Sequence, residues 1–463
     1  MKKHSGSPTI LSAFFYLLVG IIFAISLYAL TNVAKGNHFD FKTKSWYPNG
    51  MIIFTSRPSG AKLYINEKLS KYKIGSNMFP TKLNIFEPGE NRIRVEKKGY
   101  LSWNKTMTVY GGLVTWANYI WLISEHPIYE NITSNQRILR IFQSHDLGKL
   151  ILEENEGAKN KYYLYETSEN KQVEVYPKSR PGVVNAITNI TWSSGNNKLL
   201  LEGAAVEKKS FVVLFGKDFS EELDLTEIFK LNFDEVSWHH TSDNELFCIQ
   251  GGNLHRINLQ DKSISAVLAE NILSFEVTDK NKIIYISPNK DTKDITLSRM
   301  ETSGQNNEKI LSSLPQSDKY KIEYQSANDH IASLSLKDGI LNIISEINGK
   351  LITQELSISA TFAEWSGDGK RILFGNEKTV WVYDVDKQKE YSLISGKIID
   401  AKWYPDSNHI VVKENDRDIL LEFDGANQVV LAEKANSPLY FLNDFKTFYF
   451  LDAKNTLLKI TTE

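Results

Sequence analysis

The chain has 463 residues, which is too many for one ordinary domain unless the domain is built from repeats. Hydrophobic residues make up 41% and charged residues 24%, a composition that excludes a disordered chain. Its single cysteine, Cys248, excludes a disulfide framework and a cysteine metal site. The net charge of −2 is unevenly distributed along the chain. Residues 1–50 contain 5 basic residues (Lys and Arg) and 1 acidic residue (Asp and Glu), and residues 51–123 contain 11 basic and 4 acidic residues. Residues 124–463 contain 38 basic and 51 acidic residues.

Residues 10–34 form an apolar segment, because no charged side chain occurs between Lys3 and Lys35. A helix of this length would extend about 37 Å, and the hydrocarbon core of a bilayer is about 30 Å thick. We therefore expect a single transmembrane helix that binds the lipid bilayer. Residues 1–9 would be cytoplasmic and the C-terminal domains extracytoplasmic. The alternative is a cleaved signal peptide, whose apolar core would be shorter.

Residues 35–50 are polar and show no periodic pattern, so we expect a tether between the helix and the first domain. Trp46 and Tyr47 within it are suited to the headgroup level of a membrane, where aromatic rings are enriched.

Residues 51–113 are predicted to form a small β-sandwich. Alternating segments such as 61–66 and 92–97 indicate strands, and turns with Pro and Gly separate them. The turn at 58–61 reads Pro-Ser-Gly-Ala, and with the later turns it resembles the PEGA domain, which has Glu where this chain has Ser59. The resemblance implies a bacterial envelope location and a spacing or binding role without catalysis. It is carried by Pro58, Gly60, Ala61, Pro80, Pro88, Gly89, Gly99 and Tyr100.

Residues 114–463 contain a repeat in which a strand ending in an aromatic or apolar residue precedes a polar turn and a second strand. The copies lie roughly 40–50 residues apart, the length of one four-stranded propeller blade. We expect the aromatic residues to pack between adjacent blades. The clearest copies end at Trp192, Trp238, Trp365 and Trp403, and weaker ones begin near Phe142, Val277, Tyr324 and Leu442.

The turns at 366–369 and 404–406 resemble those of TolB-like and WD40-like β-propellers. The Gly-His and Trp-Asp signature of true WD40 repeats is missing, which favours the TolB-like type. Eight repeat starts predict seven or eight blades. The last blade needs a further strand, and residues 115–123 are predicted to supply it and close the ring. Alternatively, this strand is the last one of the small module.

Motifs for known chemistry are missing from the sequence: it has no Gly-x-Ser-x-Gly elbow, phosphate-binding Gly loop or His-Glu-x-x-His. His239 and His240 form the only His doublet, which we interpret as a solvated turn because adjacent strand residues face opposite ways. Residues 291–294 are acidic but do not match an EF-hand. We predict no catalytic residue, no cofactor and no metal.

The predicted fold is mainly β: a transmembrane helix, a PEGA-like β-sandwich and a seven- or eight-bladed propeller. The predicted function is that of a non-catalytic, membrane-anchored envelope protein that presents the propeller to an envelope protein or glycan. Nucleic acid is excluded as a partner because the propeller is acidic. The alternatives are a sensory or assembly subunit of a membrane complex and a glycan-processing enzyme. The enzyme would place two or three carboxylates and an Arg at the centre of the propeller.

Overall fold

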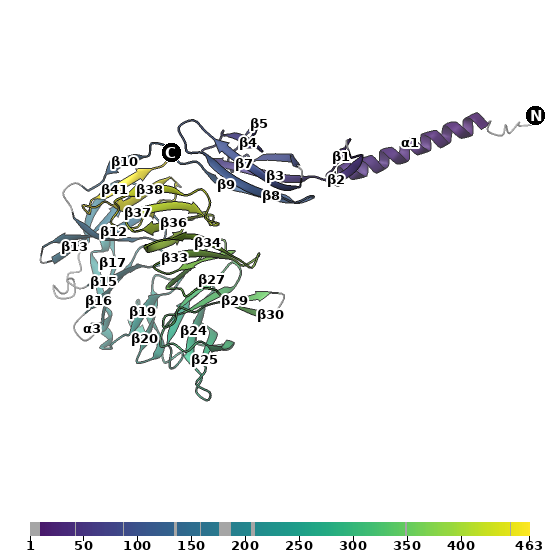
Figure 1. The fold of residues 1–463 in the computed structure, drawn as a ribbon. Helices are drawn as coiled ribbons and strands as arrows, with labels where there is room; N and C mark the ends of the chain where they lie inside the picture. Colours follow the sequence, from purple (N-terminus) through teal and green to yellow (C-terminus); the bar gives the residue numbers. More distant parts are fainter. Residues whose placement is uncertain are drawn as a thin grey trace, which may run out of the picture. The chain divides into compact units, whose positions relative to one another are not determined.

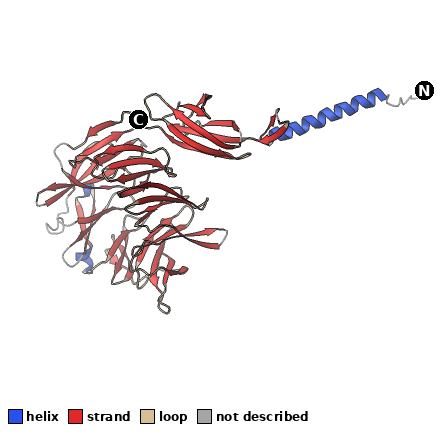
Figure 2. Cartoon of the chain, in the orientation of Figure 1, coloured by secondary structure: helices blue, strands red, loops and turns tan. Residues whose placement is uncertain are grey.

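The computed structural model describes residues 10–41, 43–86, 88–133, 137–157, 159–175, 187–204, 209–347, 350–444 and 446–463. The chain divides into two compact units, of which the first ends at Pro127 and the second comprises Ile128–Thr462. Apart from one long helix near the N-terminus, strands dominate both units (Figure 2). The mainly β fold predicted from the sequence is confirmed.

The long helix α1 (Ile10–Ala34) coincides with the predicted apolar segment (Figure 1). Its part Phe14–Ala34 is long and apolar enough to cross a membrane. The segment after it is more ordered than the predicted tether, because β1 (Asn37–Asp40) and β2 (Ser45–Pro48) form a hairpin. Phe39 lies opposite Trp46 in this hairpin with the ring centroids 5.2 Å apart. This cross-strand aromatic pair stabilises a hairpin that the sequence pattern does not reveal.

The rest of the first unit is a β-sandwich of two sheets. One sheet has the strand order β6-β3-β9 and the other β5-β4-β7-β8. Their buried core includes Phe54, Leu63, Val95 and Trp103. The strands are β3 (Gly50–Arg57), β4 (Lys62–Ile65), β5 (Lys68–Lys73), β6 (Thr81–Phe86), β7 (Gly89–Glu96), β8 (Trp103–Val109) and β9 (Val114–Trp121).

Strand β9 corrects two of the predictions. It pairs in parallel with β3 and buries Ala117 and Ile120 in the core of the sandwich. The sandwich therefore extends beyond the predicted boundary at residue 113, and residues 115–123 do not close the propeller. Their alternative assignment, the last strand of the small module, holds. The sequence leaves this open because an apolar strand fits either sheet until its pairing partner is known.

Among the described residues, the second unit contains eight four-stranded antiparallel sheets, which form the blades of a β-propeller (Figure 1). Seven sheets use four consecutive strands each. These are β11 (Ile138–Gln143), β12 (Lys149–Glu156), β13 (Lys159–Glu166) and β14 (Lys171–Val175); β15 (Ile187–Trp192), β16 (Leu199–Ala204), β17 (Lys209–Phe215) and β18 (Glu221–Asp224); β19 (Glu235–Trp238), β20 (Glu245–Gln250), β21 (Asn253–Asn258) and β22 (Ser263–Ile264); β23 (Ser274–Val277), β24 (Lys282–Pro288), β25 (Ile295–Glu301) and β26 (Glu308–Leu314); β27 (Tyr320–Gln325), β28 (His330–Ser335), β29 (Leu341–Ile347) and β30 (Lys350–Glu355); β31 (Phe362–Trp365), β32 (Arg371–Gly375), β33 (Thr379–Asp384) and β34 (Lys389–Ser395); and β35 (Ile398–Trp403), β36 (His409–Glu414), β37 (Arg417–Glu422) and β38 (Val429–Glu433).

The eighth blade joins the two ends of the propeller. Its sheet has the order β10-β41-β40-β39, with β10 (Ile128–Asn131) taken from the start of the unit and β39 (Tyr440–Phe441), β40 (Thr447–Leu451) and β41 (Leu457–Thr461) from its end. Closure by a strand from the opposite end was predicted correctly, but the strand is β10. Two short helices, η1 (Lys217–Phe219) and α3 (Leu225–Phe229), follow β17 and β18.

Each hydrophobic core of the propeller lies between two blades rather than inside one. Ile151 and Leu164 of the first blade pack with Leu199 and Val212 of the second. At the junction that closes the ring, Ile141 and Leu152 pack with Leu451 of the last blade. A sheet can bury both faces only by having a neighbour on each side, and the closed ring gives each described blade two such neighbours.

Candidate functional site

The PEGA-like residues occupy turns of the sandwich. Gly60 has φ of 81° and donates its N–H to the carbonyl of Ile74 at 2.7 Å, and Gly99 has φ of 84°. Both angles favour glycine. Ala61 is fully buried beside them. The others lie at turns and strand ends: Pro80 precedes β6, Pro88 and Gly89 lead into β7, and Tyr100 bridges to Ser124.

The four blade tryptophans are buried between blades, and all make the same contact. Each donates its indole N–H to a carbonyl on the first strand of the preceding blade. The pairs are Trp192 with Phe142 at 3.3 Å, Trp238 with Thr191 at 3.3 Å, Trp365 with Glu323 at 3.1 Å and Trp403 with Glu364 at 3.0 Å. These residues therefore join neighbouring blades and do not offer a face to a ligand.

A group of charged side chains on the first strands of adjacent blades was missed by the sequence analysis. The first strands of neighbouring blades lie close together: β23 is close to β27, β27 to β31 and β31 to β35. We name the group the inner-strand cluster; its members are Glu235, Glu276, Lys321, Glu323, Glu364 and Lys402. The charges of these groups influence one another across the strands.

Contacts of the inner-strand cluster lie both within a strand and between neighbouring blades. The Lys321 ammonium lies 2.7 Å from Glu323 Oε1 and donates to the carbonyl of Ala363 at 3.1 Å. Glu364 Oε2 accepts the backbone N–H of Trp403 at 3.3 Å. The Lys402 ammonium lies 4.6 Å from the ring centroid of Tyr440, within range of a cation–π interaction.

Burial and like charge change the titration of this cluster. Burial, with the nearby charge of Glu323, raises the pKa of Glu276 to about 8. Burial also raises the pKa of Glu364 to about 7, although the hydrogen bond from Trp403 opposes the rise. Burial lowers the pKa of Lys402 against the attraction of Asp400 and Glu364. The cluster therefore carries less charge at neutral pH than its composition suggests.

One sequence signal could have located the cluster. The residue immediately before each repeat-marking aromatic or apolar residue must face the opposite side of its strand. Glu276 precedes Val277, Glu323 precedes Tyr324, Glu364 precedes Trp365 and Lys402 precedes Trp403. A polar residue at this position in four consecutive repeats predicts that these side chains gather where the first strands converge.

Arg140 on β11 does not join the carboxylates of the inner-strand cluster, as the predicted alternative of a glycan-processing enzyme would require. Its guanidinium is ion-paired with Glu153 and donates to the carbonyls of Ile187 and Thr188, the latter at 2.8 Å. The hydrogen bond to Glu153 keeps the pKa of Arg140 raised although burial lowers it. Within the described residues, the inner-strand cluster itself combines carboxylates with lysines and contains no Arg.

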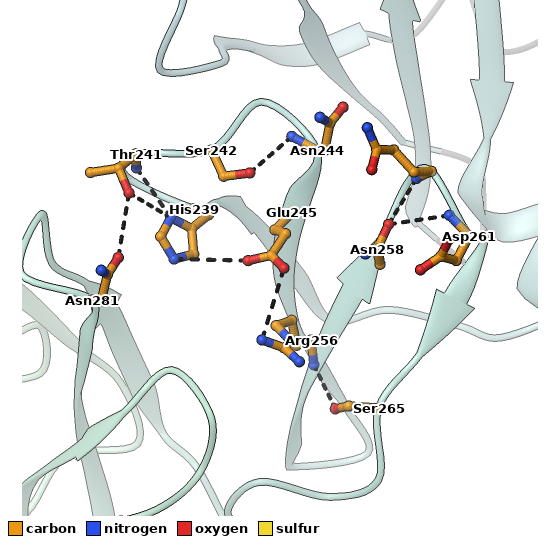
Figure 3. A network of polar contacts seen from close by, with 11 residues as sticks. His239, Thr241, Ser242, Asn244, Glu245, Arg256, Asn258, Asp261, Ser265 and Asn281 are labelled. Atoms are coloured by element: carbon orange, nitrogen blue, oxygen red, sulfur yellow. Dashed lines mark hydrogen bonds and ion pairs between the residues drawn. The ribbon is translucent and has the colours of Figure 1, made fainter.

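The histidine doublet is only half solvated, which corrects the prediction for His239. This side chain is buried while His240 is exposed. Its Nδ1 accepts the N–H of Thr241 at 3.1 Å and its Nε2 lies 3.9 Å from Glu245 Oε2, which in turn lies near Arg256 (Figure 3). Burial lowers the pKa of His239. The residue therefore organises the turn between β19 and β20.

Two further features concern metals and surface depressions. Within the described part of the chain, no group of three His, Cys, Asp or Glu residues is arranged to hold a metal ion. Residues 291–294 form an exposed turn in which Asn289 Oδ1 accepts the N–H of Asp291 at 2.9 Å.

The small module carries two surface depressions: one lies beside β5 and β6, and the other beside Lys98 and Glu125.

Comparison with known proteins identifies a family for the small module. Residues 49–120 match the PEGA domain family, and no curated protein sequence matches the chain. Among solved structures, the chain is similar to the Dos1 propeller (12% identity, TM-score 0.47, covering 72% of this chain and 93% of that one). It is also similar to a eukaryotic initiation factor (11% identity, TM-score 0.47, covering 74% of this chain and 88% of that one). A third similar structure is an oligogalacturonate lyase in complex with manganese (14% identity, TM-score 0.43, covering 73% of this chain and 98% of that one).

Proposed function

We propose that this protein is a non-catalytic, membrane-anchored component of a bacterial cell envelope that presents its propeller to a protein or glycan partner. The observation that carries the membrane part is the exposure of α1. Large apolar side chains all around the helix are exposed, including Phe15 at 61%, Phe23 at 68% and Leu30 at 65%. An apolar surface of this size is unfavourable in water and favourable in a bilayer.

Contacts at the C-terminal end of α1 support the same proposal. Tyr28 on the helix packs edge-to-face on Trp46 of the β1–β2 hairpin at 6.4 Å, and Asn37 donates to the side chain of Asn32 at 3.0 Å. Phe41 in the turn of the hairpin is 83% exposed. Aromatic side chains gathered at one end of an apolar helix suit the boundary between lipid and water.

The non-catalytic part of the proposal depends on how the inner-strand cluster is used. Its raised carboxyl pKa values are the observation that would favour acid–base chemistry. Against an enzyme, two of its contacts join neighbouring blades: Lys321 donates to the carbonyl of Ala363, and Glu364 accepts from Trp403. We therefore assign the cluster to holding the blades together and not to catalysis.

The proposal is tested by expressing the full chain and a form that begins at Gly36 in bacteria. We expect the full chain to remain in the membrane after alkaline carbonate extraction and to have the mass of the uncut chain. The shorter form should be soluble. Recovery of a soluble protein cleaved near Ala34 would instead establish a signal peptide and contradict the anchor.

Orientation and partner are tested in the same cells. Protease added outside should digest the propeller if it is extracytoplasmic. Crosslinking should then retain the same partner when a cleavable signal peptide replaces α1, if the propeller binds it. A partner that requires α1 would favour the alternative of a sensory or assembly subunit.

A further inference from the structure

A groove on the sandwich lies between two strand edges that have no neighbour. β5 is the edge of one sheet and β6 the edge of the other, since each pairs with only one strand. The groove beside them has a volume of about 660 Å³. The polar residues of its lining include Lys68, Lys71, Tyr72, Lys82 and Asn84.

The lining of this basic groove has one sign of charge. Lys68, Lys71 and Lys82 contribute three ammonium groups, and no carboxylate is found among the described lining residues. The amide group of Asn84 and the exposed ring of Tyr72 lie in the same lining, whereas the amide of Asn66 is hydrogen-bonded to Asn91 and to the backbone of Arg92. Ammonium, amide and aromatic groups together suit an extended ligand with both negative charges and an uncharged backbone.

The second depression of the module provides an internal comparison. Its lining holds four lysines, Lys62, Lys73, Lys97 and Lys98, but also Glu96 and Glu125. Both depressions lie on a module in which residues 51–123 carry a net charge of +7. The module as a whole is basic, yet the second depression contains carboxylates and the lining of the basic groove does not. The overall charge of the module therefore does not explain the lining of the basic groove.

Protection of an edge strand is the other use of such lysines. Lys68 and Lys71 on β5 would hinder the addition of a further strand, as charged residues on open edges do. These lysines therefore make the groove unsuitable for an extended peptide that would pair with the edge of β5. The lining also offers no Arg fork for bidentate carboxylate binding within the described residues, whereas Lys binds phosphate as a point charge.

We infer that the basic groove is a binding site for a linear polyol-phosphate polymer, whose phosphates would contact Lys68, Lys71 and Lys82. The inference is independent of whether α1 crosses a membrane. Binding would fall steeply with salt concentration, because each ammonium–phosphate contact displaces counterions from the polymer and interacts across water.

The test measures binding of poly(glycerol phosphate) to the full-length protein in neutral detergent, at several salt concentrations. We expect the triple variant Lys68→Gln, Lys71→Gln, Lys82→Gln to lose at least about tenfold in affinity, by analogy with other charge-assisted contacts. The control Lys62→Gln, Lys73→Gln, Lys98→Gln removes the same charge at the second depression and should change affinity less than about twofold. A triple Lys→Arg variant of the groove should retain binding.

Several outcomes would overturn the inference. Equal losses in the two triple variants would mean unspecific attraction by the whole basic module. Absence of binding by the unmodified protein would remove the site, as would binding only to vesicles of anionic lipid or only to polyglutamate. A circular dichroism spectrum and melting temperature like those of the unmodified protein establish that each variant is folded.

Discussion

At the scale of single residues, the propeller is joined by indole N–H groups. Trp365 donates to the carbonyl of Glu323 on the neighbouring blade, while Trp381 on β33 of the same blade has a buried Nε1 without a hydrogen-bond partner among the described residues. The blade thus contains one tryptophan whose N–H is used and one whose N–H is not. This difference separates the hydrogen bond from the apolar packing that both rings provide.

We predict that Trp365→Phe lowers the free energy of unfolding by about 1–3 kcal/mol, because it removes ring volume and leaves the carbonyl of Glu323 unpaired. The matched variant Trp381→Phe should cost less than about 1 kcal/mol, since it removes a donor that is unpaired already. Denaturant unfolding of both variants checks this. An equal cost would show that the interblade hydrogen bond contributes nothing measurable.

The inner-strand cluster predicts a pH dependence of stability. Glu276 has its pKa raised from an ordinary 4.5 to about 8 by burial and by Glu323 and Glu235, while Lys321 opposes the rise. The folded state therefore holds this proton more tightly than the unfolded state. The stabilisation is complete below pH 4.5 and is lost as the pH rises through 8.

We predict that Glu276→Gln flattens the fall in stability of the propeller between pH 5.5 and 9, because the amide is neutral throughout. Denaturation midpoints at four pH values provide the measurement. The control is Glu355→Gln on the exposed strand β30, which should leave the slope unchanged. A slope unaffected by Glu276→Gln would mean that this carboxyl is already solvated.

At the scale of elements, closure of the ring depends on β41. It lies between β10 and β40, and Lys459 pairs with Glu130 on one side and Tyr449 on the other. No other blade combines strands from the two ends of the unit in the part of the chain that the structure describes. Losing this sheet would expose the apolar faces of the blades at both sides.

We predict that Lys459→Pro destabilises the propeller by about 3 kcal/mol or more, because a central strand loses a backbone donor and gains a steric clash. The control is Leu351→Pro on β30, an edge strand whose six residues are all exposed. It should cost less than half as much. Thermal unfolding followed by circular dichroism compares the two, and similar losses would mean that closure is not limiting.

At the scale of the whole molecule, the chain is two units with separate cores. The core of the sandwich draws on residues from Ile52 to Leu122, and the cores of the propeller begin at Ile138. Separate cores imply that each unit gains its burial energy without the other. The small module should therefore survive damage to the propeller.

We predict two unfolding transitions in calorimetry of the form that begins at Gly36, one for each unit. Lys459→Pro should lower the temperature of only one of them. Leu63→Ala in the sandwich core should lower the temperature of the other transition, because it lowers the free energy of unfolding of the sandwich by about 2–5 kcal/mol. A single transition that both variants shift would contradict the independence of the units.

The sequence by itself determined the parts of this protein that follow from local chemistry. An uncharged apolar run is a helix in any apolar surrounding, which is why α1 was found at Ile10–Ala34. The turns that give the PEGA resemblance depend on residues such as Gly60 and Gly99, whose backbone angles favour glycine. The repeat of aromatic residues at blade spacing predicted the propeller because each blade must bury the same faces.

Only the tertiary structure decided the features that depend on which segments meet. The predicted closing strand β9 belongs to the sandwich, and β10 closes the ring, because strand pairing is a choice between partners that have equally apolar faces. The inner-strand cluster and the basic groove likewise gather residues from several strands. Proximity of Glu276 to Glu323, or of Lys71 to Lys82, exists only once the sheets are in place, so their pKa values and shared charge are properties of the fold.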